Sequence, residues 1–456
     1  MEFNIVSREL ITPSSQTHHL EPYKLCLIDQ ISPKYYFPVI LFYSNSDAKL
    51  FDLSKTLTQM KISLSETLNL YYPLSGRAKD DQYIDDFQAG VPFFEAKINW
   101  QMSEFFQREI EFHNQLLPFQ PFGKTPNNNI PPIAFQVNIF GCGGIALGIV
   151  FYHMIMDAAT MSNFLKSWAA FSSGSTHKVI NPNLVEGTIL FPPKEIDFLN
   201  DYTSVVNRFF FNEGEYTAKR FVFAIESIQT LIEMAKSKHV PNPTRNLAVT
   251  CFIWKHIMAA YWADSEPNDL ITACQVMNIR PRMKSRHNGD SLDGVVGNLV
   301  GHVGSVFDPN NDHQNVKNSS DIKLSDLVRR LKEAMEGFED YFLCQVKKGG
   351  EEASSEMLEQ VGNLSLLDKL GKPNHFISFT NWKGFFKEVD FGFGKSFKVE
   401  PILGKIMSNQ CGNMVILVDA DRWGKGSMEV FIILEHKQVS LLERDENFLA
   451  FTSKSS

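Results

Sequence analysis

The stretch QVNIFGCGGIALGIVFYHMIMDAATMSNFLKSWA, residues 136–169, decides how the first half of this chain folds. It holds two runs of large apolar residues joined by the glycine-rich turn GCGG (141–144), a pattern that predicts two paired strands. Apolar residues then recur at helical spacing, at Met161, Phe164, Leu165 and Trp168. His153 and Asp157 stand between the second strand and this helix, so the junction is the first place to look for chemistry.

The H-x-x-x-D pattern formed by His153 and Asp157 has two interpretations. Among the 12 histidines only His153 has aspartate at the fourth following position, and chance supplies roughly one such match in a chain of this length. In the structural interpretation, His153 ends a strand and Asp157 caps the helix that begins at Ala158. In the catalytic one, His153 points into a cleft from a firmly held strand-to-helix junction, as a general base must. Spacing and context leave both open.

Length and composition indicate a globular protein with two domains. A chain of 456 residues exceeds one ordinary core, and 43% hydrophobic with 21% charged residues is typical of a soluble protein. The net charge of -8 argues against a protein that coats nucleic acid. The start MEFNIVSREL does not resemble a secretory signal, no apolar run reaches about 18 residues, and the six cysteines are scattered. We therefore expect a cytoplasmic protein without a membrane or nucleic-acid partner.

The pattern of apolar residues divides the chain into two parts. The periodicity fades from about Ser172 to Tyr216, where SSGST, NPN and FPPKE supply breakers. We place an N-terminal domain at 1–190, a crossover loop at 191–216 and a C-terminal domain at 217–456. Other expected elements are a strand at 37–43, a helix from Leu53 that Pro73 and Gly76 stop, helices around 225–238, 246–264 and 325–343 (the last capped by Ser325), and strands in NMVILVDA and SMEVFIILEH.

Several common catalytic motifs do not occur in the sequence. There is no G-x-S-x-G and no H-E-x-x-H, and the histidines lack metal-ligand spacing, so no metal is expected. The GKS at 394–396 lacks the required glycine, because Val389 stands five residues before Gly394. GCGGIA (141–146) matches a dinucleotide fingerprint in form, but a strand-like run follows it, which favours a hairpin turn.

Two further stretches attract attention. Basic residues gather in IRPRMKSR (279–286), at Arg280, Arg282, Lys284 and Arg286. This cluster can receive a phosphorylated cofactor, or it can be a solvated loop with internal ion pairs. DFGFG (390–394) separates two glycines by an aromatic residue, which suits a tight bend that Asp390 can hold by hydrogen bonds. A structural role is favoured for that bend.

Together these segments resemble the plant BAHD acyltransferases over nearly the whole chain. The stretch 136–169 follows the family's strand, turn, strand, H-x-x-x-D and helix almost position for position. Other matching segments, in the family's order, are KLCLIDQ (24–30), YYPLSGR (71–77), GVPFFEA (90–96), LPFQP (117–121), TRNLAVTCFIWK (244–255), VMNIRPRM (276–283), VGNLVG (296–301), SFTNW (378–382) and DFGFG. Ala158 stands where the family commonly has a glycine after the aspartate, and in this the sequence resembles the vinorine synthase-like subgroup of alkaloid O-acetyltransferases.

The resemblance implies an α/β fold with two similar-sized mixed-sheet domains, of the chloramphenicol acetyltransferase-like type, about a solvent channel. It implies acyl transfer from CoA to an alcohol or amine. His153 matches the family's catalytic base. Asp157 matches an aspartate that turns away from the substrate and pairs with an arginine, here Arg280. Asp390 belongs to the second signature, which supports the domain interface, and we group Asp390 with the catalytic residues. The signature's usual tryptophan is Phe393 here, and Tyr152 replaces a common serine, which can alter the substrate pocket.

The same resemblance implies an acyl-CoA co-substrate and no permanently bound cofactor. We expect Ser378 and Thr380 to bind pantetheine or phosphate together with the basic loop, here Arg280 and Arg282, and Trp382 to wall the channel. Asn298 is one candidate donor to the oxyanion of the tetrahedral intermediate.

The resemblance favours acetyl as the acyl group and a bulky hydroxylated acceptor, such as a monoterpenoid indole or related alkaloid. Malonyl is the alternative donor, with Arg422 as a candidate partner for its carboxylate. N-acylation of an amine, and a noncatalytic relative that binds CoA esters or metabolites, stay open as alternative functions. The family suggests a monomer.

Overall fold

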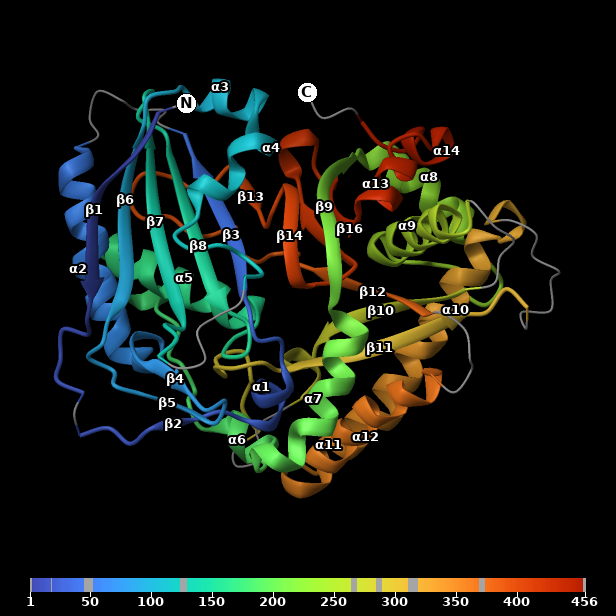
Figure 1. Ribbon diagram of the computed structural model, residues 1–456, viewed down its shortest axis with the longest axis horizontal. Helices are drawn as coiled ribbons and strands as arrows, with labels where there is room; N and C mark the ends of the chain where they lie inside the picture. Colours follow the sequence, from blue (N-terminus) through green and yellow to red (C-terminus); the bar gives the residue numbers. More distant parts are fainter. Residues whose placement is uncertain are drawn as a thin grey trace.

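The computed structural model describes residues 2–17, 19–44, 52–123, 129–263, 269–283, 289–310, 319–368 and 374–453. The chain builds two halves that lie side by side, each a mixed sheet covered by helices (Figure 1). The predicted α/β fold with two mixed sheets is therefore confirmed. Within the described residues, no helix combines the length and apolarity that crossing a bilayer requires.

The N-terminal sheet has six strands, and the stretch 136–169 supplies its centre. The strand order is β1 (Phe3–Ile11), β6 (Val91–Ile98), β7 (Ile133–Phe140), β8 (Ile145–Tyr152), β3 (Tyr36–Tyr43) and β13 (Lys398–Glu400). The predicted antiparallel hairpin joins β7 to β8, and its turn uses the left-handed conformation of Gly143 at φ 78°. Strands β3, β7 and β8 are buried along their whole length, which explains their continuous apolar runs.

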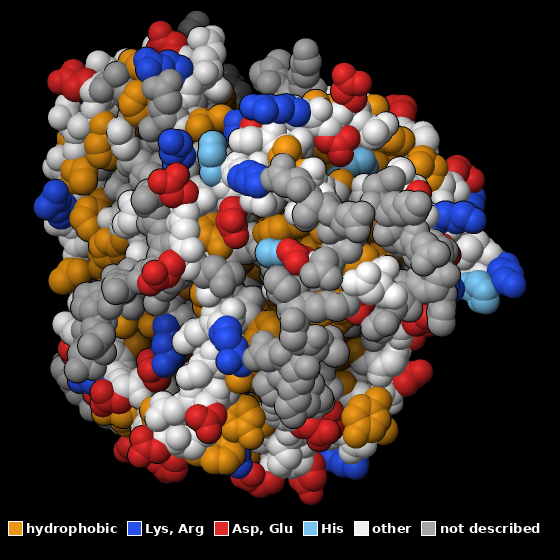
Figure 2. Space-filling view, turned by 45° about the vertical axis from the view of Figure 1, so that its right-hand side comes forward, with side chains coloured by type: hydrophobic (Ala, Val, Ile, Leu, Met, Phe, Trp, Pro, Cys, Tyr) orange, Lys and Arg blue, Asp and Glu red, His pale blue; other side chains and the backbone are white. Residues whose placement is uncertain are grey.

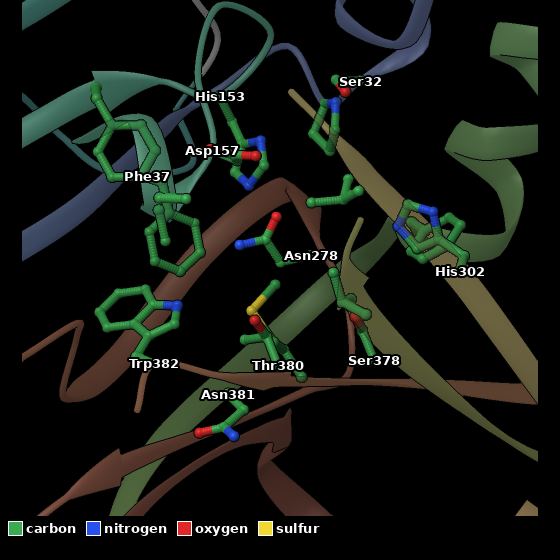
Figure 3. Close-up of a pocket in the computed structure, with 18 of the residues that line it drawn as sticks. Ser32, Phe37, His153, Asp157, Asn278, His302, Ser378, Thr380, Asn381 and Trp382 are labelled. Atoms are coloured by element: carbon green, nitrogen blue, oxygen red, sulfur yellow. The ribbon is translucent and has the colours of Figure 1, made fainter. Parts of the chain in front are cut away.

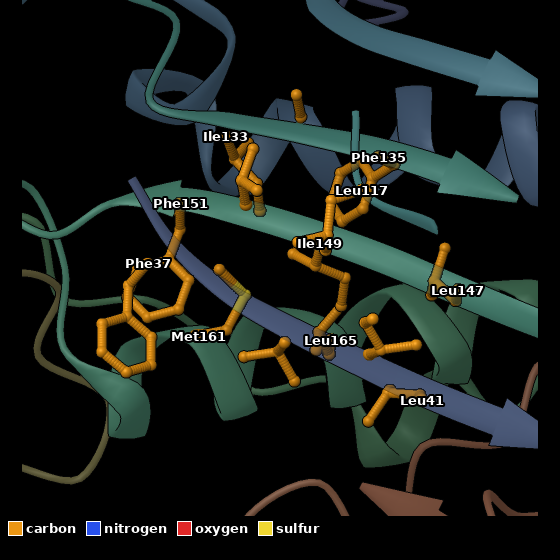
Figure 4. Close-up of a cluster of buried hydrophobic side chains, with 14 of the residues drawn as sticks. Phe37, Leu41, Leu117, Ile133, Phe135, Leu147, Ile149, Phe151, Met161 and Leu165 are labelled. Atoms are coloured by element: carbon orange, nitrogen blue, oxygen red, sulfur yellow. The ribbon is translucent and has the colours of Figure 1, made fainter. Parts of the chain in front are cut away.

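Two helices cover this sheet, namely α2 (Leu53–Leu70) and α5 (Ala158–Ser172), which also pack on each other. Met161 and Leu165 of α5 reach into the cluster of Leu41 and Ile149 on the sheet (Figure 4). Each such side chain, when fully buried, stabilises the fold by roughly 1.5–3 kcal/mol. The apolar face predicted for this helix is therefore what docks it on the sheet.

A smaller three-stranded sheet and several short helices complete the first half. The sheet has the order β2 (Tyr23–Lys24), β5 (Tyr83–Asp85) and β4 (Arg77–Lys79). The short helices are α1 (Leu27–Ile31), α3 (Met102–Gln107), α4 (Glu109–Phe112) and α6 (Glu186–Leu190).

The predicted crossover at 191–216 is not irregular throughout. It contains helix α7 (Ile196–Phe210), whose buried residues Leu199, Val206 and Phe209 lie on one face, and it runs directly into strand β9 (Asn212–Phe223). The breakers that suggested a loop, such as FPPKE (191–195), end just where α7 begins. The helix was missed although apolar residues recur at helical spacing at Leu199, Tyr202, Val206 and Phe209, because the breakers before it were given more weight.

The C-terminal sheet has seven strands. Their order is β11 (Val300–Phe307), β10 (Leu270–Asn278), β12 (Asn374–Asn381), β15 (Met414–Asp419), β16 (Met428–Glu435), β9 and β14 (Gly404–Cys411). The helices of this half are α8 (Ile225–Ala235), α9 (Arg245–Tyr261), α10 (Leu324–Gly337), α11 (Leu343–Val346), α12 (Gly350–Asp368), α13 (His436–Leu442) and α14 (Glu446–Leu449). One detail of the prediction is wrong, because Ser325 lies inside α10 and Lys323 takes the N-cap position without a side-chain cap.

One strand crosses between the halves, since β13 lies in the C-terminal part of the sequence yet pairs with β3 of the N-terminal sheet. The surface carries mixed charge. On the face shown in Figure 2, basic side chains are interspersed with acidic ones, and the described part of that face has no extended basic field.

Candidate active site

A central cavity of about 140 Å³ lies where the two halves meet. The N-terminal half contributes Phe37 from β3 and His153 from the segment after β8, and the C-terminal half contributes Asn278 from β10. Figure 3 shows the imidazole of His153 pointing into the space that Asn278 and Trp382 border. The strand-to-helix junction singled out in the sequence therefore faces a cavity.

His153 is held so that one ring nitrogen faces this space. Its backbone N–H donates to the carbonyl oxygen of Tyr35 across 2.9 Å. Its side chain is half-buried, and Nδ1 is sealed from solvent without a hydrogen-bond partner, which leaves Nε2 as the nitrogen open to the cavity. Burial lowers the pKa of His153, and the charge of Asp157 offsets part of that effect. A neutral imidazole with one accessible nitrogen can accept a proton.

The carboxylate of Asp157 is fully used within the protein. Its Oδ1 accepts the backbone N–H of Thr160 at 2.9 Å, the cap predicted for α5. Its Oδ2 accepts from Nη1 of Arg280 at 2.6 Å and from the backbone N–H of Leu299 at 3.1 Å. Burial would raise the pKa of Asp157, but the Arg280 guanidinium and the backbone N–H donors of Thr160 and Leu299 together hold the pKa below its ordinary value. Asp157 is thus both a helix cap and an ion-pair partner.

Arg280 has no donor left for a cofactor, which corrects its predicted role in CoA binding. It is 1% exposed. Besides Asp157, its guanidinium donates to Thr160 Oγ1 at 3.1 Å and to the carbonyl oxygens of Val295 and Gly297, from Nη2, at 3.1 and 2.9 Å. A fully buried guanidinium with every edge occupied cannot reach a phosphate. Its place in the site is structural.

Asn298 is also committed to the protein rather than to the cavity. Its Nδ2 donates to Asp29 Oδ1 at 3.0 Å and to the carbonyl oxygens of His153 and Met154 at 2.9 and 3.2 Å. These contacts do not support the predicted role as oxyanion donor. Asn298 therefore holds the backbone of His153 in place by hydrogen bonds.

Asp29 in turn holds Asn298 in place. It was not predicted as a site residue. Its Oδ1 accepts the backbone N–H of Asn298 at 2.7 Å, and its Oδ2 accepts that of Cys26 at 3.0 Å. Burial raises the pKa of Asp29 to about 6. The signal in the sequence was an acidic residue inside the apolar stretch KLCLIDQ.

Besides His153 and Asp157, three further predicted residues line the central cavity. Ser378 and Thr380 lie on the same face of β12, and Trp382 follows the end of that strand. The Trp382 ring lies 5.8 Å from the ring of Phe37, so the two close one wall from opposite halves. Binding of CoA by these side chains stays a prediction.

Other predicted residues lie away from the cavity. Tyr152 is on the opposite face of β8 from Phe151, because successive residues of a strand alternate, and its ring packs 5.7 Å from Tyr36. Arg422 pairs with Glu429 beyond β15. These positions do not support a role for Tyr152 or Arg422 in binding substrate.

The basic loop is only partly described. Arg282 donates to Glu339 Oε1 at 2.7 Å near the surface, and it does not line the cavity. Its role in CoA binding stays a prediction. Lys284 and Arg286 lie outside the described residues.

Asp390 holds a bend at a distance from the cavity. Its Oδ1 accepts the backbone N–H groups of Gly392 and Gly394 at 2.9 and 3.0 Å. Both glycines have φ near 100°, which disfavours any side chain. Phe393, the replacement for the family's tryptophan, packs 4.9 Å from the ring of Tyr43. The contacts of Asp390 support the structural role and not its grouping with the catalytic residues.

Several residues of the cavity were not predicted as site residues. Asn278 and His302 come from neighbouring strands, and Phe210 and Phe211 come from the end of α7. No spacing rule links positions that meet only when two sheets and a crossover helix converge.

Two mixed sheets that meet at a cavity with an accessible histidine fit a CoA-dependent acyltransferase. The model of the Transferase family, the BAHD acyltransferases, matches residues 1–449, and the chain belongs to this family. It is an acyltransferase whose co-substrate is an acyl-CoA.

The chain is similar to several plant enzymes over almost its full length. It is 32% identical to akuammiline synthase 2 of Alstonia scholaris, covering 99% of this chain and 97% of the relative. It is 30% identical to stemmadenine O-acetyltransferase of Catharanthus roseus, with 97% of each covered, and 30% identical to limonoid 7-O-acetyltransferase of Citrus sinensis, with 99% and 98% covered. The crystal structure of vinorine synthase matches with a TM-score of 0.77 at 26% identity, covering 100% of this chain and 99% of that one.

Proposed function

We propose that the protein transfers an acetyl group from acetyl-CoA to a hydroxyl group of a bulky acceptor, with His153 as the general base. The observation that carries this proposal is the neutral, half-buried imidazole of His153, whose Nε2 is open to a cavity lined by both halves. The names of two relatives, a stemmadenine and a limonoid O-acetyltransferase, support acetyl as the group and oxygen as its destination.

In this mechanism His153 Nε2 accepts the hydroxyl proton while the oxygen attacks the thioester carbonyl carbon. The C–S bond then breaks, and the imidazolium returns the proton to the departing CoA thiolate. The reaction needs no covalent intermediate on the enzyme, so no acyl-enzyme accumulates. The oxyanion requires a donor within hydrogen-bond reach, and Asn278 and Thr380 offer polar groups at the cavity, whereas the Asn298 amide is already occupied.

The lining of the cavity supports acetyl over malonyl. Among the described residues that line it there is no Lys or Arg to pair with a malonyl carboxylate. The walls include Phe37, Phe151, Phe385 and Trp382, which suit an apolar acceptor. We place a monoterpenoid indole or related alkaloid first among acceptor classes, on the names of the relatives.

We further propose that the protein works in the cytoplasm as a monomer. All six cysteines are free thiols in the structure, which fits a reducing compartment.

The proposal is tested by offering the purified protein acetyl-CoA and malonyl-CoA in competition, with panels of alkaloid alcohols, limonoid alcohols and amines, and identifying products by mass. We expect an acetylated alcohol. His153→Ala should lower kcat by about 10²–10⁴-fold, while the exposed His177→Ala serves as the matched control. Near-normal turnover by folded His153→Ala protein, or products found only with amines, would overturn the proposal.

A further inference from the structure

A second cavity adjoins the central one. Its volume is about 260 Å³, nearly twice that of the central cavity. Both cavities are lined by Ser32, Pro33, Phe210, Val300 and His302, so these five residues form the boundary between them.

One face of the C-terminal sheet runs under both cavities. On the edge strand β11, alternate residues face this way, and Gly304 and Val306 continue the second cavity beyond His302. On β10, Cys274 lies under the second cavity, where it pairs in register with Gly304, and Asn278 lies under the first. Because alternate residues of a strand point to the same face, the two cavities lie next to each other on one face of this sheet.

The lining of the second cavity is apolar with a few uncharged polar groups. Helices α7 and α12 and the π-helical turn at Phe338–Phe342 supply much of the apolar wall. The polar side chains beyond Ser32 are Thr272, His302, Gln360 and Asn363. No Lys or Arg is among the described residues that line it, so the cavity does not suit the phosphorylated nucleotide of CoA. It suits an apolar ring system.

His302 is the polar group placed where the two cavities meet. Its side chain is exposed to this internal space, and its ring lies edge-on to Phe210 at 5.3 Å. Within the described residues, the ring nitrogens of His302 have no hydrogen-bond partner in the protein. Burial, together with the nearby His153, lowers the pKa of His302 to about 4. A neutral imidazole offers one donor and one acceptor to a ligand.

We propose that the second cavity holds the ring system of the acceptor and that His302 hydrogen-bonds to a polar group on it, which makes His302 a specificity-determining residue. The inference rests on the proposed function, since the reacting hydroxyl must lie at His153 while the rest of the acceptor extends past His302. The acceptor class is a rigid, largely apolar polycyclic alcohol with a second oxygen or nitrogen remote from that hydroxyl.

The role of His302 is tested with two probes, 5α-androstan-3β-ol and its 17-keto derivative, which differ only in a remote carbonyl group. Binding is measured by quenching of tryptophan fluorescence, since Trp382 lines the central cavity, and turnover with acetyl-CoA is measured in parallel. His302→Leu should weaken binding of the keto probe by about 2- to 12-fold and leave the other probe unchanged. His302→Gln should restore the keto probe, since its amide can donate.

The cavity itself is tested by filling it at Gly304. A Cβ at this position would meet nothing closer than a Thr272 methyl group at 3.9 Å, so a side chain fits here without a clash at its base. Gly304→Leu should weaken both probes by about 10-fold or more, and the smaller Gly304→Ala should weaken them less, so that the effect follows the volume added. CoA affinity, measured by calorimetry, should stay unchanged in both variants.

Three outcomes overturn the inference: neither probe binds the wild-type protein, His302→Leu weakens both probes equally, or Gly304→Leu weakens CoA instead of the probes. The last outcome would indicate that the second cavity binds the pantetheine arm of CoA. Because binding is read without turnover, these results are independent of the His153→Ala test. If the probes bind as expected but no His153-dependent transfer occurs with any acceptor, the proposed function fails and the binding assignment stands.

Discussion

Arg280 and Asp157 form a buried ion pair that joins the two halves of the molecule, with Nη1 2.6 Å from Oδ2. Asp157 is the N-cap of α5, and Arg280 follows β10 of the other sheet. His153 lies four residues before Asp157, in the short segment between β8 and α5. The pair therefore fixes the segment that carries the proposed base, and we expect it to act through position rather than proton transfer.

Asp157→Asn should destabilise the protein strongly. The change leaves the buried Arg280 guanidinium without its counter-charge, and breaking a buried ion pair in this way costs about 3–5 kcal/mol. Urea unfolding followed by circular dichroism measures the loss.

The exposed Asp293→Asn is the matched control for that variant and should unfold like the wild type. If Asp157→Asn kept full stability yet lost all turnover, the aspartate would belong to the chemistry and the positioning role would be wrong.

The pH profile of kcat/KM should show its acid limb below pH 6.5. His153 must be neutral to accept a proton, and burial lowers its pKa from the ordinary 6.5. The neutral fraction, and with it the rate, therefore persists below pH 6.5 and is lost only as the pH falls through the lowered pKa. The charge of Asp157 raises the pKa of His153 in part, so any folded Asp157→Asn protein should show the limb at still lower pH. A limb at or above pH 6.5 would contradict this account.

Asn298→Ala should lower kcat by about 10-fold, because its amide holds the backbone carbonyl of His153 at 2.9 Å and small misplacements of a base are costly. A double variant separates this role from oxyanion stabilisation. In a His153→Ala background the further change Asn298→Ala should have little effect. An undiminished effect in that background would assign Asn298 to the oxyanion, where loss of a donor costs about 10²–10³-fold.

Asp390→Ala should lower the free energy of unfolding by about 1–3 kcal/mol, because two backbone N–H groups lose a charged acceptor. Asp390→Asn keeps an acceptor oxygen and should recover most of the stability. Thermal melting and kcat, measured on both variants, distinguish a structural residue from a catalytic one. A large fall in kcat in a fully stable Asp390→Asn protein would contradict the structural role.

The sequence by itself determined the local elements and the position of the proposed base. The hairpin of β7 and β8, helix α5 and its Asp157 cap follow from short-range rules: continuous apolar runs, a glycine turn, helical spacing and a capping carboxylate. The bend at Asp390 was legible for the same reason, because two glycines and one acceptor lie within five residues. Such features depend only on residues that are close together in the sequence, so they can be predicted from it.

Only the tertiary structure decided which distant groups meet. The resemblance placed Arg280 beside Asp157, as found, but Arg280 was also expected at CoA and Asn298 at the oxyanion. Both side chains are instead occupied by backbone groups and carboxylates around His153. His302 was not singled out in the sequence. The position of β11 at the edge of the sheet beside β10 is what places its ring between the two cavities. The physical reason is that a side chain's partners depend on how sheets and helices pack, and packing brings together residues more than a hundred positions apart that no local pattern connects.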